Sequence, residues 1–142
     1  MNQLRHQTKP EPIKNPVVPK GDIEFQHPSE REFARVLDYY AIEWRYEPVT
    51  FPTDWDEDGN LLEALTPDFF LVEQNLYIEL TTLRQSLTRI KRRKLRRLRE
   101  LYPGVRVQLW NRRDFRRLLQ RFGMQERDSE LIGEDAKDRG HG

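Results

Sequence analysis

The sequence predicts an α/β domain with the element order α-β-β-β-α-β-α. Three patterns indicate this class. Apolar residues recur at helical spacing after residue 28, they alternate with polar residues in a strand, a hairpin and a final strand, and an arginine-rich helical pattern separates the hairpin from the final strand. A length of 142 residues suits one domain with a substantial core and is too short for two domains of ordinary size.

The first helix is predicted to begin at Ser29, because Ser29 and Glu32 have the spacing of a capping box. A strand is predicted over residues 42–51, where apolar side chains alternate up to the turn sequence DWDEDGN. Three elements are expected after the hairpin: a basic helix over residues 83–101, a strand over 105–110 and a helix over 114–122.

The stretch from Thr66 to Thr82, TPDFFLVEQNLYIELTT, predicts a β-hairpin that turns at residues 72–75. In that register, opposed residues have numbers with a constant sum, so Asp68 falls opposite Glu79. Opposed side chains are about 5 Å apart at Cβ, where two like charges are destabilising. A compensating cation is therefore expected at this pair, and a divalent metal ion would serve.

A third carboxylate is expected on the core side of the domain. Glu30 precedes the apolar residues of the first helix by three, four and seven positions, which places it on the side that faces the sheet. Three inward carboxylates are costly unless cations share the site, so they predict a Mg²⁺ (or Mn²⁺) site of oxygen ligands. In the alternative interpretation, Glu30 only interacts favourably with the dipole of its own helix, and Asp68 only has a role in the turn after Pro67.

Charge is distributed unevenly along the chain. Residues 84–121 carry fifteen Lys or Arg against two acids, a net charge of +13, so the rest sums to −12 in a chain of net charge +1. Such a block is typical of a surface that binds nucleic acid, with DNA favoured over RNA, although a solvated helix face is the other interpretation. The expected contacts are Arg84, Arg89, Lys91, Arg92, Arg93 and Arg96.

The ends of the chain differ in composition from the middle. Residues 1–26 contain four of the nine prolines and are predicted to be a disordered or extended arm, residues 27–123 the domain, and residues 124–142 a disordered acidic tail. The lack of cysteine excludes disulfides, thiol nucleophiles and zinc-thiolate sites, and makes the cytoplasm the expected location. No apolar run approaches the roughly 20 residues that span a membrane, and the oligomeric state stays open, a dimer included.

These residues resemble the PD-(D/E)xK nuclease superfamily, whose signature is a Glu on the first helix, a Pro-Asp on one strand and a Glu-x-Lys on the next. The matching positions are Glu30, Pro67-Asp68 and Glu79-Leu80-Thr81, and the resemblance covers about residues 28–122. It implies a restriction-endonuclease-like α-β-β-β-α-β core, here with an extra C-terminal helix. The wider pattern also resembles a nuclease-like domain of bacterial sequences labelled hypoxanthine phosphoribosyltransferase, but no pyrophosphate-binding loop is present and no transferase activity is expected.

The resemblance implies a Mg²⁺-dependent phosphodiesterase, that is, a nuclease acting on DNA or RNA. In such an enzyme Asp68 and Glu79 would bind the metal ion, the Leu80 carbonyl would add a ligand and Glu30 would assist.

One position departs from the family pattern. Thr81 stands where the family has the Lys that orients the attacking water, and a hydroxyl can position water but supplies no charge. Lys94 is the predicted replacement, because it lies within the apolar stripe of the basic helix, and Lys91 at the edge of that stripe is second. Two other functions stay open: a catalytically inactive nucleic-acid-binding module, and a module whose arginine-rich helix docks an acidic protein.

Overall fold

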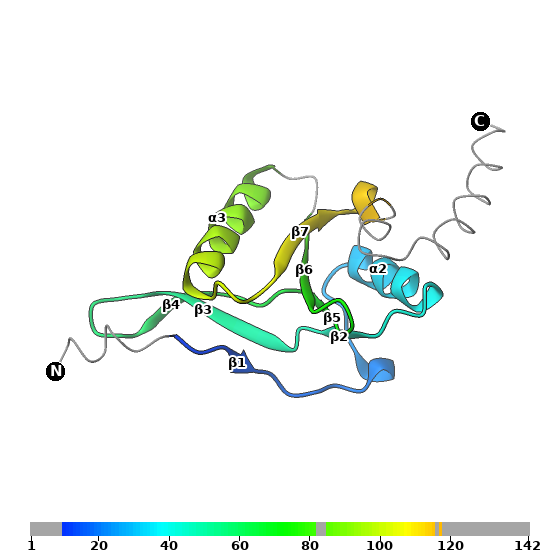
Figure 1. The fold of residues 1–142 in the computed structure, drawn as a ribbon, viewed down its shortest axis with the longest axis horizontal. Helices are drawn as coiled ribbons and strands as arrows, with labels where there is room; N and C mark the ends of the chain where they lie inside the picture. Colours follow the sequence, from blue (N-terminus) through cyan, green and yellow to red (C-terminus); the bar gives the residue numbers. More distant parts are fainter. Residues whose placement is uncertain (1–9, 82–84, 116, 118–142) are drawn as a thin grey trace.

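The computed structural model describes residues 10–81, 85–115 and 117 (Figure 1). It confirms a mixed α/β architecture with one four-stranded sheet in the order β2-β5-β6-β7 and one three-stranded sheet in the order β1-β3-β4. The elements in chain order are β1 (Ile13–Lys14), η1 (Lys20–Asp22), α2 (Pro28–Tyr39), β2 (Trp44–Tyr46), β3 (Val49–Trp55), β4 (Leu61–Leu65), β5 (Phe69–Leu71), β6 (Leu76–Thr81), α3 (Gln85–Leu101), β7 (Val107–Asn111) and η2 (Arg112–Asp114).

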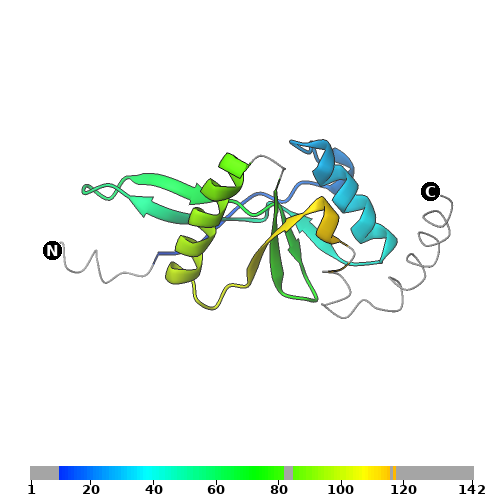
Figure 2. The same ribbon diagram turned by 90° about the horizontal axis from the view of Figure 1, so that it is seen from above.

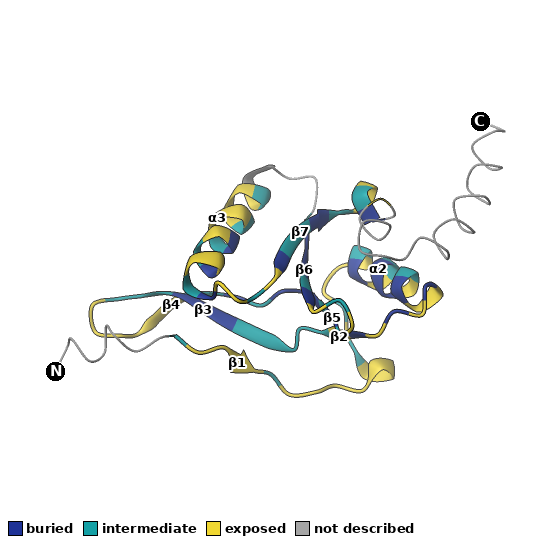
Figure 3. Ribbon diagram, in the orientation of Figure 1, coloured by how far each residue is buried: buried dark blue, intermediate teal, exposed yellow. Residues whose placement is uncertain are grey.

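The two long helices lie on opposite sides of β6 and β7 (Figures 1 and 2). Each helix closes its own apolar core, and buried residues line the side of α2 that faces the sheet (Figure 3). The α2 core is built around Phe33, Phe69 and Trp110, and the α3 core around Leu98 and Phe51. Because β6 contributes alternate side chains to both cores, its two faces meet different surroundings.

The predicted hairpin of β5 and β6 is confirmed, including its register. Phe69 pairs with Ile78 and Leu71 with Leu76, so opposed numbers sum to 147, and residues 72–75 form the turn. The next pair outward is Asp68 and Glu79. Strand β7, predicted over residues 105–110, runs parallel to β6 after the α3 crossover, as a β-α-β unit requires.

The start of α2 differs from the prediction by one residue and by its cap. The cap is His27, whose Nδ1 accepts the N–H of Ser29 at 3.1 Å, and Pro28 occupies the first helical position. The predicted capping box of Ser29 and Glu32 is therefore wrong. Proline at this position suits the helix start, because the missing N–H would have no helical partner there.

The strand predicted over residues 42–51 is wrong as one element. It is divided into β2 and β3, which belong to different sheets, because the chain turns at Glu47 with φ of 45° immediately before Pro48. Strand β3 then pairs with β4 across the turn that contains Asp58 and Gly59, and this β3–β4 hairpin extends beneath α3 (Figures 1 and 2).

Residues 10–26 run along the domain, and their path is largely extended, which is one of the two forms predicted for the arm. Ile13 and Lys14 pair with β3, and Phe25 packs edge-on against Tyr46 at 4.9 Å between ring centroids. The amide of Asn15 donates to the Glu47 carbonyl at 3.0 Å and so braces the turn between β2 and β3. The remaining residues of the predicted arm, 1–9, lie outside the described residues.

The basic helix is confirmed as α3 over its described part, which begins at residue 85. The predicted last helix lies largely outside the described residues, and the tail of residues 124–142 lies wholly outside them. Among the helices that are described, none has the length and apolar character to cross a membrane.

Candidate active site

Asp68 and Glu79 meet at one end of the β5–β6 hairpin, and both side chains are buried. Asp68 Oδ2 accepts the backbone N–H of Leu80 at 2.8 Å, and the Asp68 carbonyl accepts the N–H of Glu47 at 2.9 Å. These two bonds fix Asp68 between β6 and the turn that precedes β3. The close pair predicted from the register is therefore present, since the register of the hairpin continues from Phe69 and Ile78 to Asp68 and Glu79.

Lys91 of α3 supplies the cation at this pair. Its Nζ lies 2.9 Å from Glu79 Oε2 and donates to the Leu80 carbonyl at 2.5 Å. Its side chain is 29% exposed and that of Glu79 is 8% exposed, so the ion pair is partly shielded from water. One ammonium thus contacts two of the three oxygen ligands that the family resemblance implies for a metal ion.

The structure does not bring Lys94 to the carboxylates, and this prediction is wrong. Lys94 Nζ donates to the Ala64 carbonyl of β4 at 3.4 Å, and no described carboxylate lies within ion-pair distance of it. The reason is the orientation of α3. Its buried line runs through Lys91, Leu95, Leu98 and Tyr102, at spacings of four, three and four, whereas Leu87 and Ile90 of the predicted stripe are 42% and 45% exposed.

Glu30 is buried, as predicted, and one of its two carboxylate oxygens already accepts two hydrogen bonds. Glu30 Oε1 accepts hydrogen bonds from the Tyr46 hydroxyl and from the backbone N–H of Gln26. Within the described part of the chain, no three His, Cys, Asp or Glu side chains form a group that could hold a metal ion. Glu30 therefore lies near Asp68 and Glu79 but does not form a common metal-binding group with them.

Sequence reasoning missed Tyr46 and Glu47, which join this acidic end of the sheet. Burial and the charges of Glu30 and Glu79 raise the pKa of Glu47. Burial and the bond to Glu30 likewise raise the pKa of Tyr46. Nothing in the sequence indicates that Glu47 lies at this end of the sheet. A residue before proline favours extended backbone, whereas Glu47 has a positive φ.

The electrostatic balance of the site favours more positive charge than Lys91 provides. Burial, and then repulsion by Glu79, raise the pKa of Asp68 to about 8. Burial also raises the pKa of Glu79, although Lys91 opposes the shift. At neutral pH the pair therefore retains a proton, as two close buried carboxyl groups do.

This proton predicts an unusual pH dependence of stability in EDTA. The pKa of Asp68 is about 8 in the folded chain and near 3.8 in the unfolded chain. The protonated carboxyl group therefore makes its full contribution to the free energy of unfolding below pH 3.8, and this contribution is lost as the pH rises towards 8. The melting temperature of wild type should thus fall relative to that of Asp68→Asn between pH 5 and pH 8. Thermal melts at several pH values measure this, and parallel curves for the two proteins would contradict it.

The donor set fits a divalent ion of the Mg²⁺ type. Glu79 Oε1 is buried and has no hydrogen-bond partner among the described residues. A proton on Asp68 is one way to satisfy this atom, and a cation is another. The Leu80 carbonyl and the two carboxylates are all oxygen ligands, which Mg²⁺ and Mn²⁺ prefer. Lys91 already contacts Glu79 Oε2 and the Leu80 carbonyl. A metal ion would therefore have to share these oxygens with the ammonium group or displace it from them.

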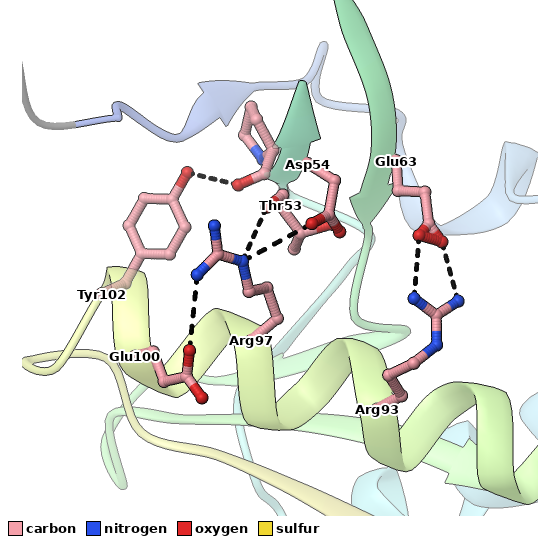
Figure 4. A network of polar contacts seen from close by, with 8 residues as sticks. Thr53, Asp54, Glu63, Arg93, Arg97, Glu100 and Tyr102 are labelled. Atoms are coloured by element: carbon pink, nitrogen blue, oxygen red, sulfur yellow. Dashed lines mark hydrogen bonds and ion pairs between the residues drawn. The ribbon is translucent and has the colours of Figure 1, made fainter. Parts of the chain in front are cut away.

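Two arginines on one side of α3 are neutralised within the protein (Figure 4). Arg93 forms a two-bond pair with Glu63 of β4, at 2.8 and 3.1 Å, which lowers the pKa of Glu63. Arg97 donates to the Thr53 carbonyl at 3.2 Å and lies 3.5 Å from Asp54 Oδ1. The predicted nucleic-acid contact of Arg93 stays a prediction, and in this structure the β3–β4 hairpin supplies an anion to that arginine.

The other side of α3 forms a basic groove against β7. Arg92, Arg96 and Arg99 line a hollow of about 360 Å³ together with Leu95, Gln108 and Leu109. Arg99 donates to the Val107 carbonyl at 2.8 Å, whereas Arg92, Arg96 and nearby Arg89 make no ion pair with any described residue. Of the predicted nucleic-acid contacts, Arg89, Arg92 and Arg96 thus stay available, Lys91 lies at the carboxylates, and Arg84 is outside the described residues.

Comparisons with known proteins add no relative to this description. No protein-family model matches the chain, and neither a curated protein nor a solved structure matches it.

Proposed function

We propose that the protein is a Mg²⁺-dependent nuclease of the PD-(D/E)xK type that hydrolyses phosphodiesters at Asp68 and Glu79. One observation carries the proposal: a buried pair of carboxyl groups and the Leu80 carbonyl converge with a lysine ammonium at the end of a sheet. Arrangements of close titratable groups with shifted pKa values are typical of active sites. Cleavage of labelled DNA and RNA at low salt, with and without Mg²⁺, tests it.

The topology supports this proposal. Without the β3–β4 hairpin, the elements α2, β2, β5, β6, α3 and β7 follow the order α-β-β-β-α-β, and the four strands lie in sequence order within one sheet. This is the order that the resemblance implies for a restriction-endonuclease-like core. In this interpretation the β3–β4 hairpin is an insertion that docks on α3 through Arg93 and Arg97.

The residues of the site have distinct chemical roles in this proposal. Asp68, Glu79 and the Leu80 carbonyl would hold Mg²⁺, which when bound polarises a phosphate and lowers the pKa of water. Lys91 replaces the missing lysine of the signature from α3 instead of from β6. Its ammonium orients a water molecule and stabilises negative charge that develops at the phosphate. Thr81, two residues after Glu79 on β6, adds a hydroxyl on the same face.

The basic groove of Arg92, Arg96 and Arg99 is the proposed contact for the nucleic-acid backbone. Arg92 and Arg96 form no ion pair with any described residue, and a guanidinium binds phosphate oxygens with planar, paired hydrogen bonds. Such contacts position the strand without reading its sequence.

Salt dependence distinguishes this groove from the paired side of α3. In the variant Arg92→Gln/Arg96→Gln, the slope of log affinity against log salt should fall by about 2, because two phosphate contacts are lost. The matched variant Arg93→Gln/Arg97→Gln removes the same charge from arginines that are already paired, so its slope should stay near that of wild type. Equal changes in both variants would contradict the assignment of the groove.

A second candidate function is an inactive nucleic-acid-binding module on the same fold. The observation that favours it is the ammonium of Lys91, which already satisfies Glu79 Oε2 and the Leu80 carbonyl without any metal ion. This candidate predicts binding without cleavage under all metal conditions. The alternative of a module that docks an acidic protein predicts neither binding nor cleavage of nucleic acid.

A further inference from the structure

A second hollow, of about 480 Å³, lies at the ends of β6 and β7, beside the candidate active site. Thr81 on β6 pairs with Asn111 on β7 in the parallel register, and both line this hollow. Thr81 follows Glu79 by two residues, about 7 Å along β6, and the start of α2 contributes the other side of the hollow. The other lining residues are His27, Pro28, Ser29, Glu32, Arg112 and Arg113, so polar side chains meet an otherwise largely apolar surface.

The cations of this hollow are available to a ligand. Arg113 makes no ion pair with any residue that the structure describes. Arg112 contacts Glu32 at 2.9 Å, but their side chains are 73% and 42% exposed, and exposed pairs of this kind are weak. An anion that enters the hollow can therefore bind Arg113 directly and compete with Glu32 for Arg112.

The helix end beside the hollow is already capped, so side chains must supply the donors. The N–H of Ser29 donates to His27 Nδ1 and the N–H of Glu30 to the His27 carbonyl. Because Nδ1 accepts, the neutral ring carries its proton on Nε2, which is the remaining donor of His27. The amide of Asn111 accepts the N–H of Asp114 through Oδ1, so its NH₂ group is the part that can donate to a ligand.

We propose that this hollow binds a phosphate group of a nucleic-acid strand, next to the phosphate at Asp68 and Glu79. Arg113 is the main contact, because a guanidinium matches the oxygen atoms of phosphate. The volume suits a group of nucleotide size, since ligand sites usually span about 300–1,000 Å³. The identity of the strand as a substrate rests on the proposed nuclease function, whereas phosphate binding rests on this hollow alone.

Binding in EDTA tests the phosphate site without any need for cleavage. The probes are fluorescent oligonucleotides of about six nucleotides, with and without a 5′-phosphate. Arg113→Gln should lower the affinity about five- to tenfold and the salt slope by about 1. Arg117→Gln is the matched control, because Arg117 is exposed, pairs with Asp114 and does not line the hollow, and its affinity should stay within about twofold of wild type.

The two probes identify the source of the phosphate. A loss that is confined to the phosphorylated probe assigns the site to a terminal phosphate, and an equal loss with both probes assigns it to an internal diester. Glu32→Gln should raise the affinity about twofold, because it removes a carboxylate that competes for Arg112.

Equal affinities for Arg113→Gln and Arg117→Gln would overturn the phosphate site, whatever cleavage shows. Conversely, a loss at Arg113 in a protein that never cleaves supports the phosphate site and removes the nuclease function.

Discussion

Replacing Lys91 by methionine is expected to lower metal-dependent cleavage about 10²-fold or more, as the loss of a general acid or base does. Methionine keeps most of the packed stem but removes the ammonium that contacts Glu79 Oε2 and the Leu80 carbonyl. Affinity for nucleic acid in EDTA should stay within about threefold, since one partly buried charge is lost outside the basic groove. Initial cleavage rates and binding curves measure the two effects separately.

Lys94→Met is the matched control, with the same chemical change three residues further along α3. Because Lys94 Nζ contacts only the Ala64 carbonyl among the described residues, cleavage should stay within about threefold of wild type. The opposite pattern, with a slow Lys94 variant and an active Lys91 variant, would return the catalytic role to Lys94.

The second large effect concerns the carboxylates. At a Mn²⁺ concentration of about 100 times the Kd, wild type should gain about 2.7 kcal/mol of stability, which corresponds to roughly 10 °C in melting temperature. Asp68→Asn and Glu79→Gln should each abolish this gain, because each replaces an anionic ligand by a neutral amide of similar size. Melting curves with Mn²⁺ and with EDTA measure the difference.

Glu63→Gln is the control for that experiment. It removes a negative charge that pairs with Arg93 on the β3–β4 hairpin, outside the carboxylate site, so the gain with Mn²⁺ should persist. A Glu63 variant that loses the gain, or Asp68 and Glu79 variants that keep it, would place metal binding elsewhere.

The hairpin of β5 and β6 shows what the sequence can predict. Its turn residues and alternating pattern determine the register, and the register alone brings Asp68 to Glu79. Local patterns also indicate α2, α3 and β7, because each has a strong period, although the cap that starts α2 differs from the predicted one.

The features that sequence reasoning missed depend on contacts between distant segments. Two hydrogen bonds to residues that are distant in the sequence hold Glu47 at its positive φ. The Asn15 amide donates to the Glu47 carbonyl, and the Glu47 N–H donates to the Asp68 carbonyl. Likewise the path of residues 10–26 is set by pairing with β3 and by the contact of Phe25 with Tyr46, which composition does not reveal.

The choice between Lys91 and Lys94 shows a limit of helical patterns. An arginine-rich helix with few apolar residues allows more than one buried stripe, and the two candidates differ by less than one turn. The buried line through Leu95, Leu98 and Tyr102 is selected by β3 and β7 packed beneath α3, and Lys91 lies on its extension. Only the packed structure distinguishes these orientations.

The most direct test of the proposed function compares wild type with Glu79→Gln in one cleavage assay. Labelled DNA and RNA, each in duplex and single-stranded form, are incubated at low salt with Mg²⁺, Mn²⁺ or EDTA. We expect wild type to cleave at least one substrate with either metal ion and none in EDTA, and Glu79→Gln to cleave none under any condition. Binding without cleavage by wild type, or equal cleavage by Glu79→Gln, would contradict the proposed function.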